Sequence, residues 1–159
     1  MPAVGRLGRG PRLSLVQPIG QQSVQGELYD VLALDAGTGE QQWAFHGPRQ
    51  AGLHQAARDL SPEQQAKLRP VCIPNPWSAP TIDSRGTVYL ANQEGPVFAL
   101  RDANGDGEVL GAGEVDSYDT LRGTPGSEAP SLAPGLMAIS TCDALYVFRW
   151  PTVPPPAAA

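Results

Sequence analysis

The most constraining feature of the sequence is a short apolar run that ends in a glycine-rich turn and leads to a tryptophan. Residues 31–43 read Val-Leu-Ala-Leu-Asp-Ala-Gly-Thr-Gly-Glu-Gln-Gln-Trp. Glycine adopts positive φ without steric cost, and short Asp and Thr side chains bond nearby backbone groups. The pattern therefore predicts a β-hairpin with strands at 28–35 and 40–45 and a large aromatic side chain on its second strand.

Five residues of this hairpin stand at a spacing found in a known family. They are Ala33, Asp35, Thr38, Gly39 and Trp43, in the pattern A-x-D-x-x-T-G-x-x-x-W. The pattern resembles the tryptophan-docking motif of the β-propellers in pyrroloquinoline quinone (PQQ) dehydrogenases and related PQQ-like repeat proteins. The resemblance implies that the tryptophan packs between its own blade and the next, while Asp35 and Thr38 hold the turn by hydrogen bonds. An ordinary Asx-turn hairpin is the alternative. The motif is structural in that family and does not imply that quinone binds.

Strand patterns return in two further units. Residues 78–82 read Ser-Ala-Pro-Thr-Ile and residues 128–132 read Glu-Ala-Pro-Ser-Leu, 50 positions later. This interval is close to the ~40–50 residues of one propeller blade. We expect strands at 87–91, 97–100 and 108–115, a loop at 117–126, and strands at 136–140 and 145–149. Residues 77–101 also resemble a PQQ-like repeat, although Arg101 stands where the docking Asp is expected and no Trp follows the second hairpin at the matching distance.

Three stretches are expected to differ from this strand pattern. Residues 1–27 form an N-terminal segment, partly disordered, with a short strand at 13–16 and a glutamine-rich loop at 21–26. Residues 47–69 predict a short helical insertion, because apolar residues recur there at three and four positions and Ser61-Pro62 is typical of a helix start. Residues 151–159 are a Pro/Ala tail that we expect to be disordered.

The expected fold is all-β: a partial β-propeller of about three four-stranded antiparallel blades over residues 28–150, with a short helical insertion. Closed propellers have about four to eight blades. Three blades would leave sheet faces and edges in water. We therefore expect further propeller blades, or a protein partner, to complete the chain.

Composition excludes several functions. With 11 Lys and Arg against 16 Asp and Glu, the net charge is −5, so a basic nucleic-acid footprint is not expected. No apolar run approaches the ~18 residues of a membrane span, and residues 1–10 carry no stretch of signal-peptide length. The compartment is not predicted. Cys72 and Cys142 could form one disulfide, but free buried thiols are the favoured interpretation.

One motif has the composition of a calcium loop. Residues 102–108 match D-x-N-x-D-G, which offers Asp102, Asn104, Asp106 and Glu108 as metal ligands. The twelfth position of such a loop is Gly113, with Glu114 one place later, and no flanking helices are expected. A polar β-turn between two strands is therefore the favoured alternative.

Other chemistry-bearing residues lack a recognisable context. His46 and His54 have no metal-ligand spacing, Asp83 precedes a turn, and Ser140 near Asp143 has no evident general base. We predict a non-catalytic β-propeller repeat module that acts as a protein-interaction scaffold. The alternative, a fragment of a PQQ-dependent dehydrogenase, would use PQQ and calcium, and no cofactor-binding residues can be assigned to it.

Overall fold

The structure, a computed structural model, describes residues 1–8, 10–23, 26–47, 77–92, 95–121, 128–141 and 143–150. Within these residues the chain is all-β, with three antiparallel sheets and no helix. None of this part forms a helix of the length and apolarity needed to cross a bilayer.

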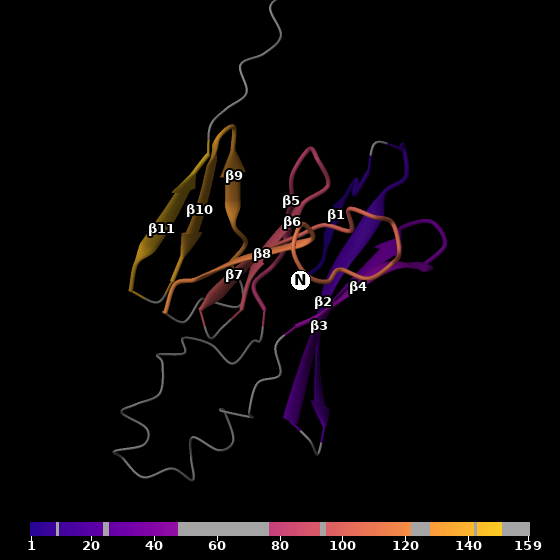
Figure 1. Cartoon of the computed structure of the whole chain (residues 1–159), viewed down its shortest axis with the longest axis horizontal. Helices are drawn as coiled ribbons and strands as arrows, with labels where there is room; N and C mark the ends of the chain where they lie inside the picture. Colours follow the sequence, from indigo (N-terminus) through magenta and orange to yellow (C-terminus); the bar gives the residue numbers. More distant parts are fainter. Residues whose placement is uncertain are drawn as a thin grey trace, which may run out of the picture.

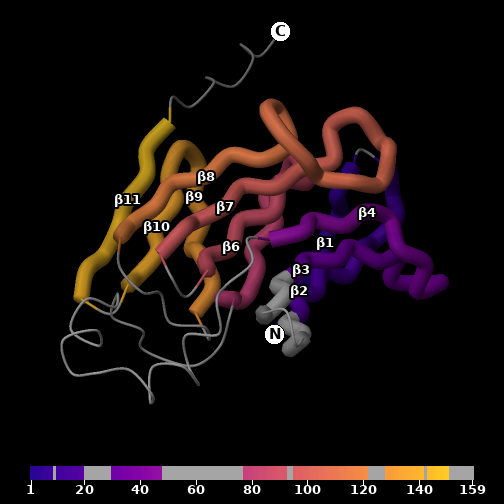
Figure 2. The backbone as a smooth tube through the Cα atoms, turned by 60° about the horizontal axis from the view of Figure 1, so that its bottom comes forward, coloured from indigo at the N-terminus to yellow at the C-terminus, as the bar shows by residue number. Residues whose placement is uncertain are grey.

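Each sheet is built from consecutive strands (Figure 1). The first sheet contains β1 (Ala3–Gly5), β2 (Ser14–Ser23), β3 (Gly26–Asp35) and β4 (Gln41–His46). The second contains β5 (Thr81–Ile82), β6 (Val88–Ala91), β7 (Pro96–Leu100) and β8 (Val115–Asp119). The third contains β9 (Ser131–Ala133), β10 (Leu136–Ser140) and β11 (Leu145–Arg149), in the order β11-β10-β9. Figures 1 and 2 show the second sheet between the other two.

The strands with strong local patterns are confirmed. β3 and β4 form the predicted hairpin, with Ala33 opposite Trp43 and a register shift just before the turn. β6 and β7 match the strands predicted at 87–91 and 97–100 to within one residue, while β10 and β11 match those of the third unit at both ends. These segments combine β-branched and aromatic residues with flanking glycine turns, so local sequence and tertiary burial favour the same structure.

The prediction of a strand at 108–115 is wrong, and so is the start of the loop predicted at 117–126, because residues 117–119 belong to a strand. Residues 122–126 of that loop lie outside the described residues. The chain bends at Gly111 and Gly113, where φ is 81° and 93°, and the strand β8 begins only at Val115. β8 is mostly exposed, so it lacks the apolar alternation by which a strand is recognised in a sequence.

The N-terminal segment is also more ordered than predicted. β1 pairs with β2, Ala3 opposite Val16, and β2 continues through part of the expected glutamine-rich loop to Ser23. A side chain added at Gly86 would meet the Leu7 carbonyl oxygen at 2.3 Å, so this segment also packs directly on the turn between β5 and β6. The helical insertion predicted at 47–69, apart from residue 47, and the tail at 151–159 lie outside the described residues.

The larger core lies between the first and second sheets. Three aromatic side chains pack together there: Phe45 of β4, Phe98 of β7, and Trp77, which lies before β5. Their ring centroids are 5.4–6.4 Å apart. Trp43 is only 4% exposed and belongs to the same cluster. The remaining buried members come from both sheets and from the connection between β7 and β8, which contributes Val109: Val16, Val31, Ala33, Val88, Leu90, Leu100 and Val109.

A smaller core lies between the second and third sheets. Ala91 and Val97 pack there with Met137 and Ile139. Since alternate residues of a strand point to opposite faces, β6 and β7 bury one set of side chains against the first sheet and the other against the third.

The long connection between β7 and β8 reaches across to the first sheet. Ala44 on β4 forms a parallel bridge with Glu108. The Ala44 N–H donates to the Gly107 carbonyl at 3.0 Å, and the Ala44 carbonyl accepts from the Val109 N–H at 2.8 Å. The connection therefore pairs with the outer edge of β4, an edge that would otherwise expose backbone groups.

Candidate functional site

The turn between β3 and β4 is held by the side chains that the motif singled out. The Asp35 carboxylate accepts hydrogen bonds from the backbone N–H of Gly37 and Thr38, at 2.8 and 3.0 Å. The Thr38 hydroxyl accepts one from the Glu40 N–H at 3.2 Å, and Gly39 has a φ of 77°. These bonds fit both the docking motif and an ordinary Asx turn, so membership of the family stays a prediction.

The same bonds tune the acidity of the turn. Hydrogen bonds from the Gly37 and Thr38 backbone hold the pKa of the Asp35 carboxyl below its ordinary value of 3.8, and the Arg12 guanidinium, 3.9 Å away, lowers it further. A carboxylate that accepts backbone N–H bonds is favoured in its charged form. Asp35 is thus a structural anion of the hairpin.

In the calcium-like loop, the acidic side chains bond to the loop itself. Asp102 accepts from the N–H of Gly105 at 2.6 Å and of Gly107 at 3.3 Å. Asp106 accepts from the Glu108 N–H at 2.9 Å and from the Asn104 amide, also at 2.9 Å. These contacts are those of successive Asx turns.

Glu114 organises this loop from its base. Its side chain is buried, and its carboxylate accepts the backbone N–H of Ala103, Asn104 and Leu110 at 3.0–3.2 Å. In the sequence, Glu114 stands one position beyond the twelfth position of a calcium loop, where a glutamate ligand is expected. Its role is to satisfy backbone donors, which would be costly to bury unpaired.

The arrangement of this loop favours the polar turn over a calcium site. Seven-coordinate calcium needs several oxygen ligands converging on one point, whereas the carboxylates of Asp102 and Asp106 are directed to backbone donors. In the part of the chain that the structure describes, no group of three or more His, Cys, Asp or Glu side chains could hold a metal ion. Calcium binding by Asp102, Asn104, Asp106 and Glu108 stays a prediction.

The remaining candidates are dispersed over the molecule. His46 is exposed and lies 3.1 Å from Asp30 and 3.7 Å from Glu108. Asp83 accepts backbone bonds from Arg85 and Thr87, as a turn residue does. Ser140 on β10 donates to the Glu128 carboxylate, with no histidine near it among the described contacts. His54, Cys72 and Cys142 lie outside the described residues.

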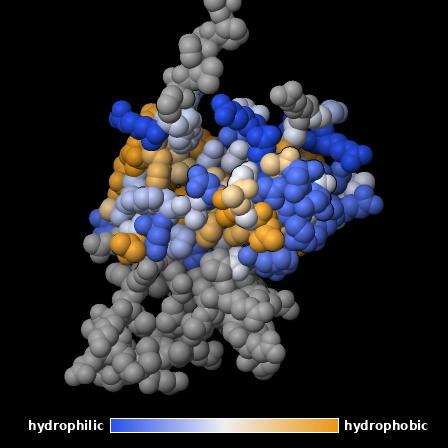
Figure 3. Space-filling model, in the orientation of Figure 1, coloured by the Kyte–Doolittle hydropathy of each residue, from blue (hydrophilic) through white to orange (hydrophobic). Residues whose placement is uncertain are grey.

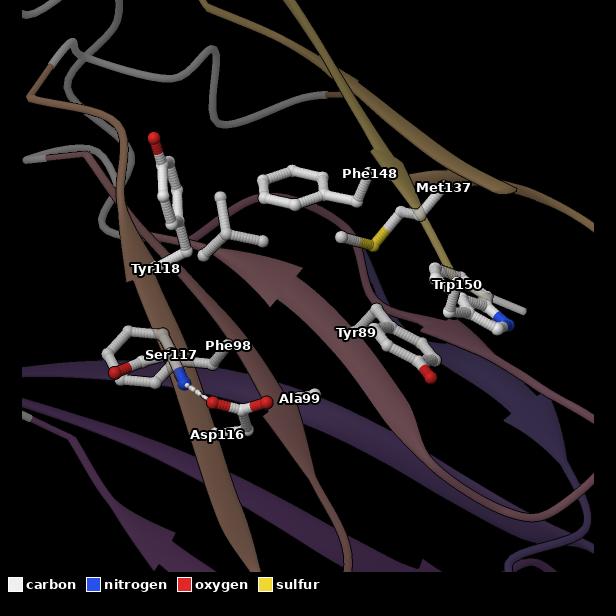
Figure 4. A pocket seen from close by; sticks show the side chains of 10 residues that line it. Tyr89, Phe98, Ala99, Asp116, Ser117, Tyr118, Met137, Phe148 and Trp150 are labelled. Atoms are coloured by element: carbon white, nitrogen blue, oxygen red, sulfur yellow. Dashed lines mark hydrogen bonds between the residues drawn. The ribbon is translucent and has the colours of Figure 1, made fainter. Parts of the chain in front are cut away.

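A cavity of about 360 Å³ opens between the second and third sheets (Figure 4). Sequence reasoning missed it, because its walls come from units about 50 residues apart in the chain. Tyr118 on β8 faces Phe148 on β11, their rings 5.3 Å apart in a T-shaped contact. Trp150 stacks on Tyr89 at 6.4 Å and nearly parallel. The sequence signal that could have pointed to this space is that the third unit ends after three strands.

The cavity carries one negative group and aromatic walls. Asp116 contributes the carboxylate, whose Oδ1 accepts the Ser117 N–H at 2.9 Å, and no Lys, Arg or His belongs to the described lining. Burial raises the pKa of the Tyr89 hydroxyl, and the Asp83 carboxylate adds to this effect. PQQ is a tricarboxylate, so this lining does not fit it. The arrangement is suited to an apolar or cationic group.

Comparisons with known proteins assign no identity: no protein-family model and no curated protein matches the chain. The geometry of the sheets and of this cavity is therefore the basis for the function.

The lowered pKa of Asp35 predicts how stability depends on pH. A carboxylate with a depressed folded-state pKa contributes stability above its unfolded pKa and loses it as pH falls through the folded value. We expect the urea unfolding midpoint of the wild-type protein to be higher than that of Asp35→Asn. The difference should be constant from pH 7 to about 5 and should shrink below about pH 4. A midpoint difference that stays unchanged down to pH 2 would contradict this account.

Calorimetric titration with calcium tests the acidic loop. We expect no saturable heat up to about 1 mM calcium, the range of weak extracellular sites, in wild type or in Asp106→Ala. Saturable heat in wild type that disappears in Asp106→Ala would show that the loop rearranges to bind the ion.

Proposed function

We propose that the chain is a non-catalytic β-propeller-type module of the PQQ-like repeat kind, which serves as a scaffold for protein interaction through the outer face of its third sheet. The observation that carries the proposal is an apolar sheet face left in solvent at the end of a stack of sheets. Further blades or a partner protein would cover it.

The outer face of the third sheet exposes several apolar side chains, with Arg149 beside Leu136 on the same face. Leu136, Leu145 and Val147 are 37%, 68% and 51% exposed. The register places Val147 beside Ala138 and Leu145 beside Ser140, so these side chains share one face. Figure 3 shows hydrophobic side chains at this end of the molecule. Contiguous exposed apolar residues mark interaction sites more often than scattered ones do.

The second sheet has an equivalent face, and in this molecule that face is covered by the third sheet. In the second sheet, Val97 pairs with Ala91. Leu145, which pairs with Ser140, holds the equivalent position in the third sheet. Val97 is 3% exposed because the third sheet covers it, whereas Leu145 has no such cover. The third sheet therefore repeats the second without its neighbour, which supports a partner of similar shape. The acidic lining of the cavity gives no support to the dehydrogenase alternative.

The proposal predicts association through this face. Wild-type protein should associate with rising concentration in sedimentation velocity, while Leu145→Lys with Val147→Lys should remain monomeric with an unchanged unfolding midpoint. Leu110→Lys is the matched control, since Leu110 is 81% exposed on the β7–β8 connection. A wild-type monomer at all concentrations, with a sharp unfolding transition, would contradict the proposal.

A further inference from the structure

The third sheet has an open edge where the other two sheets have a fourth strand. β4 pairs with β3 in the first sheet and β8 with β7 in the second. In the third sheet, β11 holds the place of β3 and β7, and no described strand pairs with its other side. The fold itself therefore defines the shape of the missing element, which is one extended strand.

The hydrogen bonds of β10 and β11 show which groups face this edge. The Thr141 N–H donates to the Ala144 carbonyl at 2.7 Å, and the Trp150 N–H to the Gly135 carbonyl at 3.2 Å. Antiparallel pairs alternate between bonded and non-bonded, so Tyr146 and Phe148 bond to β10. The backbone groups of the intervening residues point outward: Leu145, Val147 and Arg149.

The cavity lies beside this edge. Its walls join Asp116 and Tyr118 of β8 to Phe148 of β11 (Figure 4). A strand added to β11 would direct alternate side chains, those opposite Tyr146 and Phe148, toward the second sheet and into this space. Tyr118 is 52% exposed, so its ring has free surface for such a side chain.

The chemistry of the cavity defines the incoming side chain. A cationic group there would meet the Asp116 carboxylate and the faces of aromatic rings, which attract cations. No described lining residue would repel it. An acidic side chain would instead face Asp116 and be disfavoured.

We propose that the open edge of β11 binds an extended segment of a partner protein as a fourth strand, with a lysine or arginine side chain in the cavity beside Asp116. This inference rests on the proposed scaffold function and adds the edge of β11 to the outer face of the third sheet as a binding surface. Main-chain hydrogen bonds would supply affinity, and the cavity would supply specificity, as in other cases of strand addition.

The test uses a capped synthetic peptide, Thr-Val-Thr-Lys-Thr-Val-Thr, titrated into the full chain by calorimetry. Its even positions would face the second sheet, and the N–H groups of its odd positions would face β11. Methylating the backbone nitrogens of the third and fifth residues should weaken binding about tenfold, since two hydrogen bonds are lost. Methylating those of the second and sixth residues, which face away from β11, should leave the affinity within about twofold.

A charge cycle tests the cavity. Asp116→Asn should weaken binding of the lysine peptide by about three- to fivefold, the effect of losing an exposed ion pair. Binding of a norleucine analogue should be unchanged.

Equal binding of both methylated peptides would overturn strand pairing. Absence of peptide binding, while Leu145→Lys with Val147→Lys still abolishes association, would overturn this inference and leave the scaffold function standing. Equal effects of Asp116→Asn on both peptides would overturn the cationic preference.

Discussion

The contact between Phe45, Trp77 and Phe98 is the interaction on which the rest of the structure depends. It joins the first sheet to the second through edge-to-face and tilted ring contacts, a geometry that adds to the free energy of area burial. A single sheet leaves its apolar face in water unless another layer covers it. The first two sheets therefore become stable by covering one another, and the second then offers its other face to the third.

The connection between β7 and β8 strengthens the same joint in a different way. It leaves the second sheet, pairs with β4 of the first, and returns, with Glu114 satisfying its backbone donors. Its D-x-N-x-D-G pattern is accounted for by Asx turns at that bend. The edge of β4 is covered, whereas β11 has no described strand on its outer side. This asymmetry is the reason that we propose the third sheet as the interaction surface.

Strands that carry their own hydrophobic pattern could be predicted from the sequence, and those stabilised by pairing alone could not. β10 and β11 were found to the residue because Leu136–Ser140 and Leu145–Arg149 are short runs rich in apolar residues, and β11 also in aromatic ones. β1 and β8 were missed because they are short or exposed and depend on backbone hydrogen bonds to β2 and β7. Such bonds leave no trace in the local sequence.

The candidate site divides in the same way. The hydrogen bonds of Asp35 and Thr38 are local and could be expected from the turn sequence. The cavity could not, because Tyr118 and Phe148 belong to different sheets and meet only through their stacking. A missing strand is likewise visible only when three assembled sheets are compared.

Native-state hydrogen exchange in Phe98→Ala tests most directly whether the aromatic contact couples the first two sheets. Truncating a buried phenylalanine costs about 3–5 kcal/mol, and coupled elements open as one cooperative unit. The account predicts that amides of β3, in the first sheet, and of β6, in the second, lose protection by the same free energy. Loss of protection in β6 with β3 unchanged would contradict it.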